Sequence, residues 1–270
     1  MKTKKVLITG HKGYIGQHLW KLIEKTRPDI DLYGLDITDM GVGHGDIRVT
    51  KFYVDTDFHT VIHLAAKVQV GESVNKPTLY YDTNVNGTLN VLRNVQYHNF
   101  IMASTGAACN PDSPYGFSKR IAEDLVKEHA YDYTIFRFYN VMGSEGFPAT
   151  NPDGLFYALC KAYNTTNEIN LYGTDYNTKD GTCVREYVHV MDICAALVKA
   201  IDEPSKQIEH LAYGDTRTVK EIIDIFRNVN GKNIRVKDLP RRPGDLEACY
   251  LEHPSKYMVQ NYTYEEMLKI

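Results

Sequence analysis

The feature that most constrains the fold is a glycine triplet near the N-terminus, in the segment KVLITGHKGYIG. Lys5–Thr9 is a continuous apolar run typical of a buried strand, and the amphipathic stretch from Tyr14 to about Lys25 predicts a helix after it. Gly10, Gly13 and Gly16 stand between the two. Glycine permits a tight turn there and lets the backbone approach a pyrophosphate at the helix N-terminus. The segment therefore predicts a dinucleotide-binding unit.

An aspartate at the end of the next predicted strand, Asp31–Asp36, indicates which dinucleotide binds. Asp36 follows Gly16 by 20 residues, a distance at which a carboxylate can hold the ribose 2′-hydroxyl. The same negative charge would repel the 2′-phosphate of NADP, so we expect NAD. The alternative is an ordinary turn with a capping aspartate.

Strands and helices alternate through the first half of the chain. Further apolar strands are predicted at Thr60–Ala66, Phe100–Thr105 and Tyr133–Met142, and helices at Pro77–His98 and Tyr115–Ala130. Near-continuous apolar strands between helices imply a parallel sheet covered on both faces, and right-handed crossovers make it doubly wound. The predicted fold class is α/β, a Rossmann-type doubly wound parallel sheet with a smaller α/β substrate-binding lobe.

The second half of the sequence is richer in loops, which predicts a separate lobe. We expect a dinucleotide-binding domain at residues 1–142, with returning segments at about 184–215. The smaller lobe is expected at residues 143–183 and 216–270.

Composition narrows the classes of partner. A net charge of -3 and a pI near 6.4 give no basic surface for nucleic acid or acidic membranes. The five cysteines are scattered without CxxC spacing, which argues against a disulfide framework or a zinc site. The N-terminal segment has no apolar signal region, and no run approaches the length of a membrane span. We expect a cytoplasmic protein with no metal and no nucleic-acid or membrane partner.

The segment SPYGFSKRIAEDL, Ser113–Leu125, carries a candidate acid/base pair. Ser-Pro is typical of a helix start, and Tyr115 and Lys119, four residues apart, then share one helix face. Such a pair is either an ordinary surface pair or a device in which the ammonium lowers the pKa of the phenol. Thr105, at the end of the preceding strand, adds a hydroxyl.

The glycine spacing GxxGxxG, the Tyr-x-x-x-Lys pair and the strand-end hydroxyl together resemble the extended short-chain dehydrogenase/reductases. Longer segments are similar to the UDP-glucose (UDP-galactose) 4-epimerases of that family, and the chain resembles a shortened member. These segments span most of the chain in order: GDIR (Gly45–Arg48), VIHLAAKVQVGESV (Val61–Val74), YYDTNVNGTLNVL (Tyr80–Leu92), LYGTDYNTKDGTCVREYVHVMDICAAL (Leu171–Leu197) and RRPGDLEACY (Arg241–Tyr250).

The resemblance implies a role for each matching residue. Tyr115, Lys119 and Thr105 are the implied catalytic residues. The implied NAD contacts are Gly10, Gly13, Tyr14, Ile15, Gly16, Asp36, Asp46, Ile47, Leu64, Ala65, Ala66, Lys67, Asn84, Tyr115, Lys119 and Tyr139. The implied UDP-sugar contacts are Thr105, Asn140, Tyr172, Arg185, Tyr187, Arg242, Asp245 and Cys249. Arginines at such positions suit a diphosphate, because a guanidinium binds phosphate oxygens bidentately.

The implied reaction inverts C4 of a UDP-hexose, UDP-glucose or UDP-galactose, through a 4-keto intermediate. Tyr115 is the expected base, with its phenolate favoured by Lys119 and by the positive nicotinamide. Cys249 stands where relatives carry a bulky tyrosine that excludes N-acetyl groups, so we expect UDP-GlcNAc and UDP-GalNAc to be accepted as well. The alternative for Cys249 is a packing cysteine in a shifted loop. Helices Pro77–His98 and Tyr115–Ala130 resemble those that pair in the family's homodimers, and we expect a homodimer.

The chain departs from these relatives in several places. The segment after Asp36 is short, and only nine residues separate Thr105 from Tyr115. Lys67 precedes by one position the lysine that the similar epimerases carry, so Val68 stands at that position, and Gly154 replaces a substrate-side asparagine. These differences bear on cofactor affinity and on the rim of the site.

Other functions remain open at the level of sequence. A related nucleotide-sugar epimerase/dehydratase is one, although dehydratases and decarboxylating relatives need a carboxylate after the strand-end hydroxyl, where this chain has Gly106, Ala107 and Ala108. A reductase more often uses NADPH, which Asp36 disfavours. A non-catalytic NAD-sensing protein of the same fold is the alternative from another class.

Overall fold

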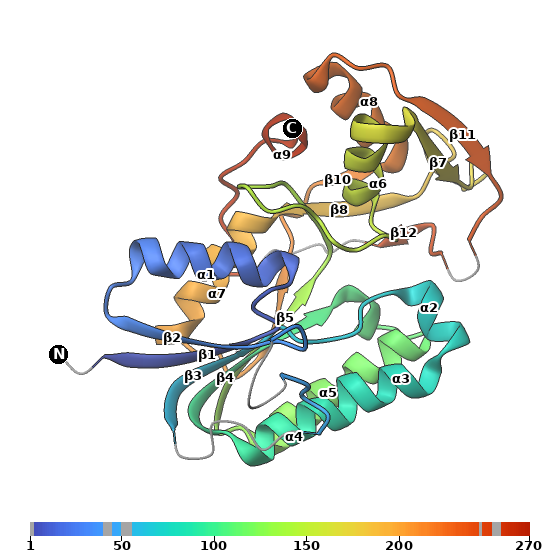
Figure 1. Cartoon of the computed structure of the whole chain (residues 1–270). Coiled ribbons are helices and arrows are strands. Elements are labelled where there is room, and N and C mark those ends of the chain that lie inside the picture. The colour runs from blue at the N-terminus through green and yellow to red at the C-terminus, as the bar shows by residue number, and fades with distance from the viewer. Residues whose placement is uncertain (1–2, 40–44, 50–55, 243–244, 250–254) are drawn as a thin grey trace. The chain divides into compact units, whose positions relative to one another are not determined.

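The structure is a computed structural model that describes residues 3–39, 45–49, 56–242, 245–249 and 255–270. The chain packs as two units (Figure 1), one formed by Met1–Phe138 with Cys194–Glu209 and the other by Tyr139–Ile193 with His210–Ile270. The predicted boundary at 142 lies four residues beyond the observed one, and the predicted returning segment 184–215 is longer than the segment that packs in the first unit.

The first unit is built on a six-stranded sheet in the order β2-β1-β3-β4-β5-β9. Its strands are β1 (Lys4–Thr9), β2 (Ile30–Leu35), β3 (Asp57–His63), β4 (Gln96–Thr105), β5 (Asp132–Phe138) and β9 (Ile208–Leu211). The pairs among β1 to β5 run parallel. The strand order reverses between β1 and β3, the position where open α/β sheets bind ligands at their carboxyl ends. The predicted α/β, doubly wound fold class is confirmed.

Helices cover both faces of this sheet. Figure 1 shows α1 (Tyr14–Thr26) and α7 (Val190–Asp202) on one face, and α3 (Pro77–Tyr81), α4 (Gly87–Asn94) and α5 (Pro114–His129) on the other. The short helices α2 (Val70–Asn75) and η2 (Gly106–Ala108) follow the ends of β3 and β4. No helix in the described part of the chain is long and apolar enough to cross a membrane.

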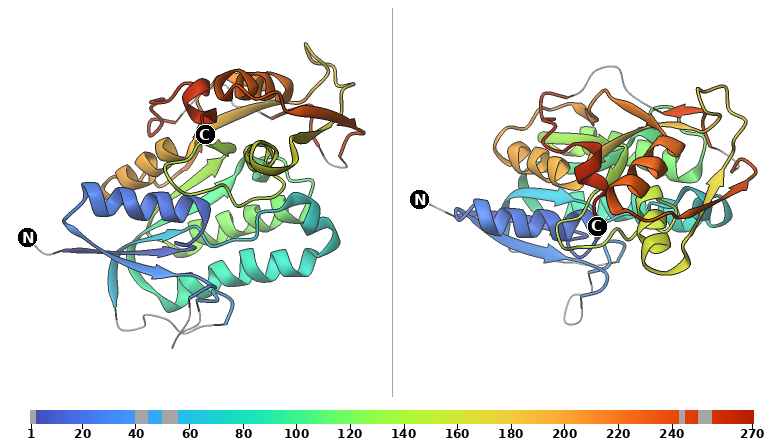
Figure 2. Two further views of the ribbon diagram at one scale, coloured as in Figure 1. Left: turned by 45° about the horizontal axis from the view of Figure 1, so that its top comes forward. Right: turned by 90° about the horizontal axis from the view of Figure 1, so that it is seen from above.

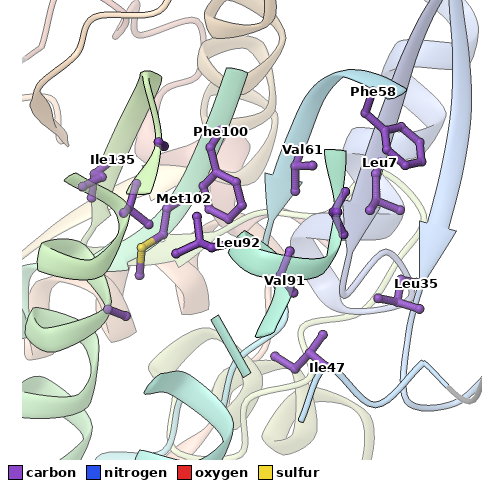
Figure 3. Packing of buried hydrophobic residues seen from close by; sticks show 14 residues of the cluster. Leu7, Leu35, Ile47, Phe58, Val61, Val91, Leu92, Phe100, Met102 and Ile135 are labelled. Carbon is purple, nitrogen blue, oxygen red and sulfur yellow. The ribbon is translucent and has the colours of Figure 1, made fainter. Parts of the chain in front are cut away.

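The apolar runs seen in the sequence form the core between the sheet and the α4–α5 face. Figure 3 shows Phe58, Val61, Phe100 and Met102 of the strands facing Val91 of α4, and these side chains are fully buried. Burial of each such side chain contributes about 1.5–3 kcal/mol. The strands are continuously apolar because helices cover both faces of the sheet.

The predicted helix Pro77–His98 differs from the observed one. The observed helix ends at Asn94. A π-helical turn, η1 (Asp82–Asn86), lies between α3 and α4, and the three form one continuous rod (Figure 2). A π-turn inserts one residue into the helical repeat and is often found at functional sites. Helix α5 begins as predicted, because Pro114 occupies its first turn and the Ser113 hydroxyl accepts a hydrogen bond from Gly116 N at 3.3 Å.

The second unit contains two small sheets and three helices in its described residues. Strand β8 (Val184–His189) pairs with β6 (Asn140–Met142), β10 (Thr216–Thr218) and β12 (Ala248–Cys249), and β7 (Glu168–Tyr172) pairs with β11 (Arg235–Leu239). The helices are α6 (Leu155–Lys161), extended by η3 (Ala162–Thr166), α8 (Val219–Asn230) and α9 (Tyr264–Leu268). The predicted strand Tyr133–Met142 is divided at Tyr139 into β5 and β6.

Candidate active site

The glycine loop brings helix α1 unusually close to the end of β1. Gly10 has φ +73, a left-handed value that favours glycine, and Gly13 N donates a hydrogen bond to Gly10 O at 3.0 Å. A Cβ on Gly16 would lie 2.3 Å from Gly10 O, so α1 could not approach the loop with any other residue there. No side chain caps the N-terminus of α1 at Gly13, which leaves its backbone N–H groups for an anion.

A pocket of about 420 Å³ opens in the first unit where these strands end. Nine of the predicted NAD contacts line it: Gly10, Gly13, Asp36, Asp46, Ile47, Leu64, Ala65, Ala66 and Lys67. Gly45 and Arg48, from the GDIR segment noted in the sequence, also line it, and sequence reasoning missed three others: Ile37, Leu79 and Thr83. Leu79 and Thr83 are four residues apart on the rod of α3 and η1, and that helical spacing was the available signal.

Asp36 lies on the pocket wall with its carboxylate held in a fixed orientation. It accepts hydrogen bonds from Lys12 N at 3.1 Å and from Thr38 N and Oγ1 at 3.0 and 2.8 Å. Asp39 accepts a hydrogen bond from Asp36 N and pairs with the Lys12 ammonium at 2.5 Å. A dinucleotide with a 2′-phosphate would meet the Asp36 carboxylate here, which supports the expectation of NAD.

Not every predicted NAD contact lies on the pocket wall. Tyr14, Ile15 and Gly16 begin α1, where Gly16 serves close packing. Asn84 is 1% exposed, and its side chain accepts from Lys67 N at 2.8 Å and donates to Lys67 O at 2.9 Å and to Ser118 Oγ at 3.0 Å. Asn84 therefore bridges Lys67, in the segment that follows β3, and Ser118 on α5.

A buried histidine that sequence reasoning passed over ties the same elements together. His63 shares hydrogen bonds with Thr9 Oγ1 at 2.8 Å and Thr88 Oγ1 at 3.0 Å, which joins the ends of β1 and β3 to α4. Burial lowers the pKa of His63 to about 3, so the ring is neutral at physiological pH. Its place within the VIHLAA run was the available signal.

The three predicted catalytic residues come together in the first unit. Thr105 ends β4, and Tyr115 and Lys119 lie one turn apart on α5, both more than nine-tenths buried. A hydrogen bond with Thr105 lowers the pKa of Tyr115, but burial raises it more, so that this pKa lies above its usual value. Lys119 Nζ donates to Ala103 O at 2.6 Å, and burial lowers the pKa of Lys119 to about 8.

The electrostatics of this group differ from the sequence-based expectation in one respect. A phenol pKa lowered by Lys119 was expected, whereas the structure shows burial as the largest influence on Tyr115. The reason is that an enclosed site disfavours the charged form of every group in it, the phenolate included. Tyr80 contributes to this enclosure with its ring edge-on to that of Tyr115, at 6.3 Å between centroids.

Within the second unit, the predicted UDP-binding side chains form two groups, one at β8 and one at β7. Arg185 lies 3.8 Å from the Asp245 carboxylate and faces Cys249 in the β8–β12 register. Arg242 stacks over the ring of Tyr172 at 3.8 Å. Pro243, Gly244 and Tyr250 of the predicted Arg241–Tyr250 segment lie outside the described residues.

Among the remaining predicted residues of this unit, Tyr139 and Asn140 have hydrogen-bond partners. Tyr139 shares a hydrogen bond with His210 at 3.1 Å, and Asn140 donates to Glu186 O at 2.9 Å. Tyr187 is 1% exposed and its ring belongs to the apolar cluster of the unit, while its buried hydroxyl has no hydrogen-bond partner among the described residues. Gly154 is the N-cap of α6.

The described residues contain no group of three or more His, Cys, Asp or Glu side chains that could hold a metal ion. The loop, the pocket and the Tyr115–Lys119 pair instead define a dinucleotide-dependent enzyme of the short-chain dehydrogenase/reductase class. Residues 6–213 match the NAD dependent epimerase/dehydratase family. The chain belongs to this family, and its expected cofactor, NAD, is confirmed.

Known proteins similar to this chain agree on the branch of the family. The chain is 30% identical to UDP-glucose 4-epimerase of Pasteurella multocida, over 98% of this chain and 95% of that one. It is 28% identical to the Homo sapiens enzyme of the same name, over 92% and 88%. Its fold matches UDP-glucose 4-epimerase from Bifidobacterium longum in complex with NAD+ and UDP, with a TM-score of 0.84, 29% identity and coverage of 98% and 96%. The resemblance seen in the sequence is confirmed.

The contact at Gly16 predicts a selective defect in cofactor binding. We expect Gly16→Ala to push α1 away from Gly10 and to weaken NAD binding about tenfold or more. Titration of the cofactor-free protein with NAD can be followed by the fluorescence of Trp20, the one tryptophan, whose ring lies 5.2 Å from that of His11 in the loop. The matched control is Gly71→Ala, where an added Cβ meets nothing within 4 Å. Equal affinities for the two variants would contradict the role of Gly16.

Proposed function

We propose that this protein is an NAD-dependent epimerase that inverts C4 of a UDP-hexose, UDP-glucose or UDP-galactose, through a 4-keto intermediate. The observation that carries the proposal is the buried pair of Tyr115 and Lys119, with Thr105 beside Tyr115, in the unit that contains the dinucleotide pocket. The near full-length similarity to UDP-glucose 4-epimerases supports it.

The residues of the first unit have distinct tasks in this reaction. Tyr115 Oη takes the proton of the sugar 4-hydroxyl and later returns it, and the Thr105 hydroxyl, already bonded to Tyr115, binds the same sugar oxygen. Lys119 favours the phenolate through its positive charge. The cofactor supplies a hydride acceptor that is regenerated within each turnover, and its positive nicotinamide offsets the cost of a buried phenolate.

We further propose that residues of the second unit hold the UDP group. Arg185 and Arg242 provide the guanidinium forks for the diphosphate, with Asp245 and Tyr172 beside them. Tyr139 and Asn140 remain proposed contacts of the nicotinamide and the diphosphate. Tyr14, Ile15 and Gly16 remain proposed contacts of the pyrophosphate through the N-terminus of α1.

The competing functions lack a specific observation in their favour. Elimination of water needs an acid after Thr105, and the residues there are Gly106, Ala107 and Ala108 in the turn η2. Glu123, a carboxylate close in sequence to Lys119, is fully buried and paired with Arg137. A protein that only senses NAD has no need of the complete Tyr115 set.

Replacement of the proposed base gives the direct test. We expect Tyr115→Phe to lower the rate of UDP-galactose epimerisation by about 10²–10⁴-fold, because the proton acceptor is removed while the buried ring is kept. A coupled assay that detects UDP-glucose measures this. The control is Tyr131→Phe, since Tyr131 is 85% exposed. Near wild-type turnover by Tyr115→Phe would rule out this base.

We also propose that UDP-GlcNAc and UDP-GalNAc are substrates. Cys249 is a small side chain that faces Arg185, a proposed diphosphate ligand, across the β8–β12 pairing. A UDP-Glc/GlcNAc 4-epimerase from Campylobacter jejuni, 25% identical with a TM-score of 0.80, is among the similar structures.

The substitution Cys249→Tyr tests this substrate range. We expect it to lower UDP-GalNAc turnover by about tenfold or more and to change UDP-galactose turnover by less than about threefold, because the added ring fills the space for the N-acetyl group. Cys249→Ser, of nearly unchanged size, should keep both activities. If wild-type protein converts UDP-galactose and leaves UDP-GalNAc untouched, the proposal is wrong.

We propose that the protein acts in the cytoplasm as a homodimer. The five cysteines, all within the described residues, form no disulfide, as expected in a reducing compartment. Phe117 and Ile121, 45% and 42% exposed, lie one turn apart on α5 and form an apolar stripe suited to a second copy of the same helix. The formal charge of -3 supports a small-molecule substrate over nucleic acid or membrane partners.

The double substitution Phe117→Glu/Ile121→Lys is expected to halve the mass measured by light scattering after size-exclusion chromatography, because charges replace the apolar stripe. Val49→Glu, at a residue that is 78% exposed outside the helices, is the control and should stay dimeric. A wild-type protein that is monomeric at micromolar concentration would contradict the homodimer.

A further inference from the structure

A buried ion pair lies one helical turn beyond Lys119. Glu123, on α5, is fully buried, and Arg137, on β5, is 6% exposed. Arg137 donates to both carboxylate oxygens of Glu123, from Nε at 2.8 Å and from Nη2 at 2.6 Å. Ser104 Oγ donates to the same carboxylate at 2.6 Å. The carboxylate is therefore held by two elements of the sheet.

Three consecutive residues at the end of β4 bind three different side chains of α5. Ala103 O accepts from Lys119, Ser104 Oγ donates to Glu123, and the Thr105 hydroxyl bonds to Tyr115. Tyr115, Lys119 and Glu123 are spaced by four residues, which places them along one face of the helix. Glu123 is thus the third member of a row whose other two members belong to the proposed chemistry.

The charged groups around Lys119 explain why its buried ammonium needs an anion nearby to stay protonated. Lys119 is 4% exposed, and its hydrogen-bond acceptor, Ala103 O, carries no net charge. The other titratable or charged groups around it are Tyr115 on α5, His63 on β3, which is neutral, and Arg137 on β5, which is a cation. Among the described residues around Lys119, Glu123 supplies the negative charge. Its carboxylate raises the pKa of Lys119 against the larger effect of burial.

Stability alone is a weak reason to bury such a pair. Removing two charges from water costs several kcal/mol per ion, and apolar residues of similar volume often serve a core as well. A fixed carboxylate beside a buried ammonium has a different use, since it keeps the ammonium charged where solvent cannot.

We propose that Glu123 is a positioning residue that keeps Lys119 protonated and aimed at the Tyr115 site at working pH, with Arg137 and Ser104 fixing its carboxylate. This inference rests on the proposed function of Lys119. It assigns to the Glu123–Arg137 pair a role in proton chemistry in addition to packing.

The titration of Lys119 in the cofactor-free protein tests the inference without any turnover. In protein labelled with 13C at the lysine ε-carbon, the Lys119 resonance is identified by its loss in Lys119→Arg. We expect Glu123→Gln, which keeps size and polarity but removes the charge, to lower the midpoint of that resonance by about one pH unit or more. Ser104→Ala removes a hydrogen bond from the same carboxylate without changing its charge, and should leave the midpoint within about 0.3 units.

The double variant Glu123→Gln/Arg137→Gln removes both charges. It replaces the single variant in this experiment if loss of the Glu123 carboxylate beside Arg137 prevents Glu123→Gln from folding. It is also expected to lower the Lys119 midpoint. A midpoint that stays at the wild-type value in the folded variant would overturn the inference.

Epimerase activity gives an independent readout. In Glu123→Gln the alkaline limb of the pH–rate profile should move to lower pH by the same interval as the Lys119 midpoint, whereas a purely structural role would lower activity by one factor at every pH. Wild-type protein that fails to epimerise UDP-sugars would defeat the proposed function, and the Lys119 titration would still decide the role of Glu123.

Discussion

The end of β4 is bound to the inner face of α5 through three neighbouring residues, and the site of the first unit depends on this pairing. Ala103, Ser104 and Thr105 present a carbonyl and two hydroxyl groups to side chains placed four residues apart on the helix. A strand advances about 3.3 Å per residue and a helix about 6 Å per four residues, so the two rows meet only when the helix crosses the strand end at a suitable angle. The sheet and its core provide that angle.

The cofactor pocket depends on a second close approach, that of α1 to the loop after β1. Gly10 and Gly16 leave no room for a Cβ between them, and the N-terminus of α1 therefore reaches the carboxyl edge of the sheet. His63 and Asn84 then join this edge to the rod of α3, η1 and α4 through buried hydrogen bonds. The π-turn η1 contains Asn84, and an altered helical repeat there is consistent with a residue that must point at a fixed backbone segment.

Much of the first unit could be predicted from the sequence because its signals are local. The apolar runs, the glycines and the Ser-Pro before Tyr115 each specify a strand, a turn or a helix start within a few residues. The π-turn was missed because an unbroken helical pattern does not reveal one inserted residue. The burial of Tyr187 was missed because a tyrosine in a motif looks the same whether it contacts a ligand or the core. The burial that raises the pKa of Tyr115 could not be predicted, because it is a property of the surroundings, which the Tyr115–Lys119 spacing does not contain.

By itself the sequence determined the class of fold and predicted the glycine loop for the dinucleotide and the Tyr115–Lys119 pair, since each follows from residue type and short-range spacing. Only the tertiary structure decided which groups hold Glu123, the next side chain on the same helix face. Glu123 and Arg137 are 14 residues apart, on a helix and on a strand, and no periodicity links them. Their contact exists because α5 packs across β4 and β5, and the electrostatic field at Lys119 is set by that packing.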